Sequence, residues 1–124
     1  MLRSPALAAA VAGLALLAAA PAEAKTAKAC KSSDLQFPFM PGGPKFFGVH
    51  KLKVTGGTCA TAHRVAKDWK KRFEANLHKG SDKLPKHVDG FTFSQVEVHA
   101  AQTFGMKGVR GATTIRFNYV VPNG

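Results

Sequence analysis

The sequence predicts a small α+β domain in which one amphipathic helix packs on one face of an antiparallel sheet of three to four strands. Two observations predict this class. Apolar residues recur with helical spacing between residues 58 and 77, and short segments of alternating apolar residues lie on both sides of that stretch. Because each element has one apolar face, the helix and the sheet are expected to bury these faces against each other.

The first 24 residues have the three parts of a secretory signal peptide. Arg3 gives the basic start, residues 6–20 form an apolar run rich in Ala and Leu, and Ala22-Glu23-Ala24 fits the small-x-small cleavage rule. The run is shorter than the roughly 20 residues that span a bilayer as a helix. We therefore expect a secreted, extracellular protein with residues 1–24 removed and no transmembrane segment after cleavage.

The rest of the chain divides into an arm and a single domain. Residues 25–45 contain three prolines and a Gly-Gly pair, which disfavour long regular structure and predict an extended arm. Residues 46–124 are assigned to one α+β domain. About a hundred residues are enough for a modest core with little stability to spare.

The domain begins with a strand and the helix. Residues 46–54 are predicted to form a half-buried strand, because Leu52 and Val54 alternate with two lysines. After a Thr-Gly-Gly turn, Thr58 can accept a backbone N–H and so cap the helix. The buried side of the helix is predicted from residues three and four apart: Ala62, Val65, Ala66, Trp69 and Phe73.

Two further strands are predicted after a loop. In residues 91–100 the alternation changes parity between Phe93 and Val96, which predicts either a bulge or partial covering of both faces. Residues 113–121 alternate regularly and form the last strand. Residues 101–112 contain three glycines, and we predict a mobile hairpin connection there.

Cys59, at the start of the helix, has three candidate roles. A disulfide with Cys30 is favoured because an exported chain meets an oxidising environment, and the closed loop would contribute roughly 3.5 kcal/mol in the chain-entropy model. A free thiol there would be activated by the helix N-terminus. With His99 on a later strand, Cys59 would then follow the residue order of papain-like cysteine hydrolases. His63 could share a metal with Cys59, but no further ligands complete a site, so we expect no metal and no cofactor.

The charge of the chain predicts an anionic partner. There are 18 basic and 7 acidic residues, and the net charge of +11 is unchanged by removal of the signal peptide, which carries one Arg and one Glu. Such a field attracts envelope polymers, phospholipid layers and acidic polysaccharides, although it also serves solubility alone. Nucleic acid is disfavoured because no aromatic residues are interleaved with the basic ones. The candidate anion-binding surface comprises Arg64, Lys67, Lys70, Lys71, Lys107 and Arg110.

The arm suggests an alternative to polyanion binding. Residues 37–45, "FPFMPGGPK", form an extended, proline-stiffened stretch after Cys30. An exposed stretch of this kind can occupy the substrate groove of a peptidase. The alternatives to a non-enzymatic polyanion-binding protein are therefore an extracellular protease inhibitor and the Cys59 and His99 hydrolase.

Three stretches carry a family resemblance: "VTGGTCATAHRVAKDW", "VDGFTF" and "GVRGATTIRF". Together they resemble small secreted actinobacterial proteins of unknown function. Those proteins have a signal peptide, an early Cys, a "SCATA"-type helix start, a "GF-x-C" strand and a last strand preceded by a further Cys. The resemblance covers most of residues 30–117. It implies that Cys30 and Cys59 form a structural bond, and it implies a fold but no activity.

The second cysteine pair of that pattern is absent here. Phe93 stands at the position of the "GF-x-C" cysteine, and no cysteine lies near Gly108. The joint absence implies that the two missing cysteines are partners in the family. We expect a buried Phe93 that fills part of the vacated space.

Overall fold

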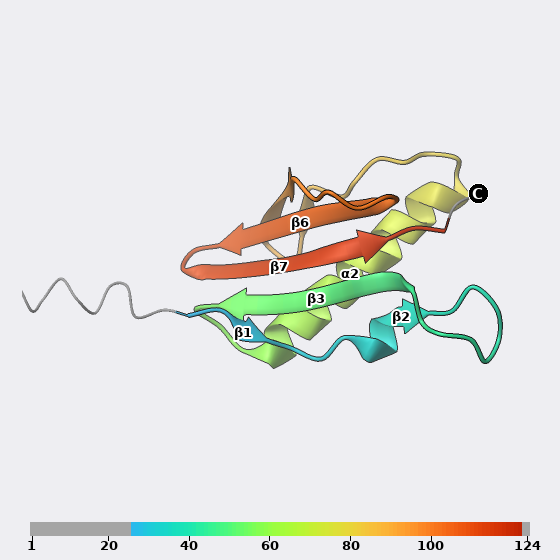
Figure 1. Cartoon of the computed structure of the whole chain (residues 1–124). Coiled ribbons are helices and arrows are strands. Elements are labelled where there is room, and N and C mark those ends of the chain that lie inside the picture. The colour runs from blue at the N-terminus through green and yellow to red at the C-terminus, as the bar shows by residue number, and fades with distance from the viewer. Residues whose placement is uncertain (1–25, 123–124) are drawn as a thin grey trace, which may run out of the picture.

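The computed structural model describes residues 26–122, so the signal peptide predicted at residues 1–24 lies outside the described residues. Helix α2 (Cys59–His78) lies across one face of an antiparallel sheet, and β3, β7 and β6 cross in front of it in Figure 1. The α+β class with one helix on one sheet face is therefore confirmed. The sheet has seven strands, so the predicted number of three to four was too small.

The strands run in the order β1-β3-β7-β6-β5-β4, and β2 also pairs with β3. Each pairing is antiparallel. The strands are β1 Lys28–Ala29, β2 Gln36–Phe37, β3 Phe47–Thr55, β4 His87–Val88, β5 Phe91–Val96, β6 Thr103–Arg110 and β7 Thr113–Val120. A short 3-10 helix, η2 (Ser33–Leu35), lies between β1 and β2. Three of the strands have two residues each, too short to leave an alternation in the sequence.

The prediction of a mobile connection at residues 101–112 was wrong. Residues 103–110 form β6, which lies inside the sheet between β5 and β7. Its glycines are there because the neighbouring side chains leave no room for a Cβ. A Cβ on Gly108 would lie 2.5 Å from ring atoms of Phe93, and one on Gly105 would collide with Val98. In this strand glycine permits close packing and does not mark a turn.

The change of parity in residues 91–100 reflects covering of both faces. The pairing of β5 with β6 runs without a register shift, so no bulge is present. Phe91 and Phe93 are buried under the helix, whereas Val96 lies half-buried on the other face with Val98, beyond the end of the strand. Of the two interpretations, partial covering of both faces is therefore the correct one.

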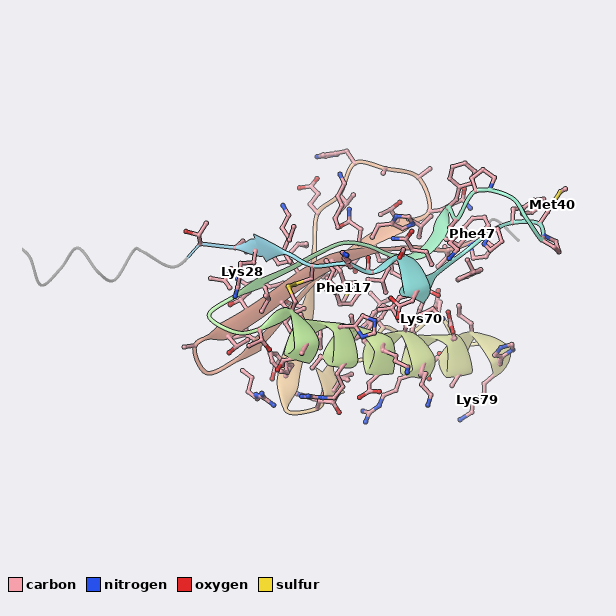
Figure 2. The ribbon with its side chains drawn as sticks, turned by 90° about the horizontal axis from the view of Figure 1, so that it is seen from below. Lys28, Met40, Phe47, Lys70, Lys79 and Phe117 are labelled. Carbon is pink, nitrogen blue, oxygen red and sulfur yellow. A yellow bond between two sulfur atoms is a disulfide. The ribbon has the colours of Figure 1, made fainter. Side chains whose placement is uncertain are left out.

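The helix has the boundary and buried face that its periodicity predicted. Thr58 caps it, since its side-chain oxygen accepts a hydrogen bond from the Thr61 N–H at 3.2 Å. The five residues predicted to face the sheet are all fully buried. At the centre of the core, the Trp69 ring lies against four others: Phe73, Phe93, Phe117 and Tyr119, with centroid separations of 5.1, 6.4, 5.2 and 5.6 Å. Figure 2 shows Phe117 between the sheet and α2.

A disulfide joins Cys30 to Cys59, as predicted, with their Cα atoms 5.4 Å apart. The Cys30 N–H also donates to the Leu52 carbonyl at 2.8 Å. The disulfide therefore fixes the residue after β1 to α2, and the hydrogen bond fixes the same residue to β3. The arm is thus held along the edge of the sheet. Its residue Ser32 is buried and donates to the Val49 carbonyl at 2.9 Å.

We expect replacement of both cysteines by alanine to lower the free energy of unfolding by about 2–4 kcal/mol, because the unfolded chain regains the entropy of an open loop. Urea denaturation of wild type and Cys30→Ala/Cys59→Ala measures the difference. An unchanged midpoint would mean that strand pairing alone holds the arm.

Gly108→Ala should lower the free energy of unfolding by about 1–3 kcal/mol, because the added methyl group meets the Phe93 ring. A smaller side chain opposite should relieve the clash. In a double-mutant cycle with Phe93→Leu, the two losses are therefore expected to be less than additive. Full additivity would contradict the contact.

Candidate functional site

The face of the sheet away from α2 carries a row of cations. Register places Lys53 of β3 opposite Arg116 of β7, and Arg116 opposite Lys107 of β6. Alternate residues of a strand point to opposite faces. Since the sequence neighbours Val54 and Ile115 are fully buried against the helix, the three cations point to the open face.

A bulge in β3 brings a fourth cation to this face. Between His50 and Lys53, β3 has one residue more than the facing part of β7, and Lys51 at the bulge has a φ of 55°. Lys51 and Lys53 are both exposed on either side of buried Leu52. We call the four residues Lys51, Lys53, Lys107 and Arg116 the basic sheet face.

Three of the four residues of the basic sheet face line a hollow of about 200 Å³. Lys51, Lys53 and Arg116 line it together with Asn118 and residues 96–98, which are the last residue of β5 and the two after it. It can accommodate a group the size of a phosphate or a carboxylate. One acidic residue of that segment, at position 97, also lines the hollow, where its carboxylate lies 3.5 Å from the His99 ring nitrogen.

Within residues 26–122, no carboxylate forms an ion pair with any of the three cations of the row. The ion pairs found among residues 26–122 join other side chains: His63 with Asp34, Lys70 with Glu74, and His99 with Glu97. Like charges directly opposite on neighbouring strands are destabilising. A bound anion would remove that repulsion, so the arrangement favours an anionic ligand.

The six residues predicted as an anion-binding surface are divided between the two faces. Lys107 belongs to the basic sheet face. The helix carries four others: Arg64, Lys67, Lys70 and Lys71. Lys70 is neutralised by Glu74, whose carboxylate lies 3.0 Å away. Arg110 belongs to neither group, because its guanidinium lies at the turn between β4 and β5 and donates to the Asp89 carbonyl at 3.0 Å.

The sequence predicted the orientation of most of the basic sheet face but not its assembly. Lys51, Lys53 and Arg116 alternate with buried residues, which predicts that they point away from the core. Their gathering depends on the register of β3 with β7 and on the presence of β6. Register between strands far apart in the sequence leaves no mark that a single sequence reveals.

Cys59 and His99, the residues of the hydrolase hypothesis, are not brought together. The Cys59 sulfur is in the disulfide, so it offers no thiolate. The start of α2 lies near Thr113, which donates to the Gly56 carbonyl at one end of the sheet. His99 follows β5 at the other end, exposed and beside Glu97.

His63, the other candidate metal ligand, is occupied by the arm. Its Nε2 lies 2.7 Å from the Asp34 carboxylate, and this hydrogen bond lowers the pKa of Asp34. The contact links η2 to α2. Within residues 26–122, no three His, Cys, Asp or Glu side chains are grouped in a way that could hold a metal ion.

A carboxyl pair lies on the outer side of the helix layer. Asp89 and Gly90, with φ values of 52° and 82°, form the tight turn between β4 and β5. A hydrogen bond with Asp68 raises the pKa of Asp89, with further contributions from burial and from the charge of Asp68. When both groups are ionised, Asp89 Oδ2 is buried without a donor. These surroundings therefore favour the protonated form of Asp89 more than water does.

A pocket of about 490 Å³ lies at the end of the helix layer, with Phe37 and Leu77 in its walls. Three of its polar side chains pair with one another: Tyr119 donates to Glu74, and Glu74 pairs with Lys70. Burial and the hydrogen bond to Glu74 raise the pKa of Tyr119, so the phenol keeps its proton. The pocket thus has mainly apolar walls, and the charges of Lys70 and Glu74 in it are paired.

Family models, curated proteins and solved structures were all compared with the chain, and none matches it. Functional inference therefore depends on the fold, the disulfide and the basic sheet face. In the part of the chain that the structure describes, no helix has both the length and the apolar character needed to cross a membrane.

Asp89→Asn should stabilise the protein at neutral pH. A raised pKa means that the stability contributed by protonated Asp89 is present below the unfolded value of 3.8 and is lost as pH rises through the folded value. Asparagine tolerates positive φ and keeps a donor for Asp68 without that loss. Thermal denaturation should show the advantage of the variant growing from below pH 3.8 toward neutrality. Asp82→Asn, in the exposed loop, serves as the control, and an advantage independent of pH would contradict the raised pKa of Asp89.

Proposed function

We propose that the protein is a secreted, non-enzymatic domain that binds a polyanionic component of the cell envelope or its surroundings through the basic sheet face. The observation that carries this proposal is the register of Lys53, Arg116 and Lys107 on adjacent strands, with no ion-pair partner in the described part of the chain. Strands in a sheet lie about 4.8 Å apart. The row therefore spaces its charges closely enough to contact successive anionic groups of an extended polymer.

The backbone of the sheet supports recognition because it holds these side chains in place before binding. β7 is paired along its length with β3 and β6, so Arg116 projects from the centre of the sheet. A guanidinium can donate two parallel hydrogen bonds to a phosphate or a carboxylate. Asn118 lies beside it in the hollow and adds an uncharged donor.

The disulfide supports an extracellular site of action. Disulfides persist in oxidising surroundings and are rare in reduced compartments. Here the bond fixes a proline-rich arm to a domain whose core has a single helix layer. A small extracellular domain that lacks the core of a larger protein is commonly stabilised in this way.

The test compares two triple variants with the same loss of charge. Lys53→Gln/Lys107→Gln/Arg116→Gln removes the row, whereas Lys67→Gln/Lys71→Gln/Lys79→Gln removes exposed cations of the helix and its C-cap. Exposed ion pairs each contribute about 0.2–1 kcal/mol, so loss of the row should weaken polyanion binding roughly 3- to 100-fold. Titration against heparin at several salt concentrations measures both variants.

The control variant should retain most of its affinity at each salt concentration, because the helix cations lie on the other layer. Equal losses in the two variants would mean that net charge alone drives the association. That result would reject the basic sheet face as the site.

A further inference from the structure

The loop between β2 and β3 exposes the most apolar surface of the described chain. Phe39, Met40 and Phe46 are 72%, 56% and 59% exposed. Residues 37–44 contain no polar side chain. Figure 2 shows Met40 at the outer end of this loop, at the edge of the molecule. We call residues 38–46 the apolar loop.

The apolar loop is built to keep its shape. β2 and β3 close its base through the pairing of Phe37 with Phe47, whose rings lie 5.6 Å apart. At its tip, the Gly43 N–H donates to the Met40 carbonyl at 2.9 Å, and Gly42 has the positive φ of 80° that this turn needs. The exposed side chains are thus held out from the protein.

The loop backbone is also suited to an environment poor in water. Three of its residues are prolines, which have no N–H that would have to leave water unpaired. The Gly43 N–H is already bonded within the turn. Beside Phe46 at the base, Lys45 is exposed, with its ammonium donating to the Ser33 carbonyl at 3.4 Å. A cation at this level can reach lipid headgroups while the tip lies deeper.

The small size of the loop argues for a bilayer over a protein partner. Stable protein interfaces use about 20–30 residues on each side, far more than one convex loop supplies. A bilayer interface accepts single aromatic and Met side chains, and their contribution adds to electrostatic attraction. Neither a few apolar side chains nor a polybasic surface anchors a protein firmly alone, but the two together do. The net charge of +11 supplies the second part.

We propose that the apolar loop inserts Phe39 and Met40 into the interfacial region of a bilayer with anionic phospholipids. The electrostatic half of this inference rests on the proposed polyanion binding, and it identifies the anionic partner as a lipid surface. The loop supplies the apolar anchor, and the cations supply attraction to the headgroups.

The experiment uses three forms of the mature protein and two probes. The forms are wild type, Phe39→Ser/Met40→Ser, and a control, Leu77→Ser/Val109→Ser, that removes two exposed apolar side chains elsewhere. The probes are vesicles of phosphatidylglycerol and phosphatidylcholine, measured by co-sedimentation, and heparin, a polyanion with no apolar phase. Vesicle binding should fall about tenfold or more in the loop variant only, while heparin binding stays unchanged in all three forms.

A second measurement reports insertion directly. Trp69, the only tryptophan of the protein, is fully buried, so a Phe39→Trp variant adds one exposed indole. Its fluorescence should shift to the blue with anionic vesicles, be quenched by brominated lipid, and stay unchanged with heparin. Equal vesicle binding by wild type and loop variant, with no blue shift, would overturn the inference.

The heparin probe separates this inference from the proposed function. Wild type that binds heparin but not vesicles overturns lipid insertion alone, whereas wild type that binds neither overturns both. Inhibition of a chymotrypsin-like protease by wild type but not by the loop variant, without vesicle binding, would assign the loop to a protein partner and also overturn lipid insertion.

Discussion

The packing of Trp69 against the sheet is the contact on which the rest of the structure depends. One helix has to cover a sheet of four long strands, and the Trp69 ring of this helix reaches residues of both β5 and β7. The indole N–H also donates to the Pro85 carbonyl at 3.1 Å, which fixes the loop after the helix. The Trp69 side chain thus connects the helix both to the sheet face that it covers and to the loop that returns the chain to β4.

A core with a single helix layer leaves the other sheet face in water. Antiparallel sheets tolerate this because their strands alternate apolar and polar residues. Here the polar side of three neighbouring strands carries Lys53, Arg116 and Lys107, a spacing that costs free energy when the face is unliganded. The same one-sided packing that stabilises the domain therefore leaves room for its candidate binding surface, on the sheet face opposite to the helix.

Sequence patterns predicted the elements whose signal is local and missed those whose signal comes from across the sheet. The cap at Thr58, the buried helix face and the disulfide each follow from residues close in sequence or from the chemistry of an exported chain. Strand β6 was missed because glycines in a sequence usually indicate a turn. The structure shows that Gly105 and Gly108 leave room for the side chains of Val98 and Phe93, which lie beside them. Phe93 is 4% exposed and lies opposite Gly108, so the expectation that it is buried is met. For the site, side-chain direction was predictable and register was not.

The outermost strands of the sheet, β1 and β4, have only two residues each. A long exposed edge strand offers a row of unpaired N–H and C=O groups to which another chain can add, and short edge strands remove most of that template. Copies held close together on a charged surface would meet at high local concentration. At β1 and β4 the backbone available for joining sheets is only two residues long, so these two strands give crowded copies little template for edge-to-edge pairing.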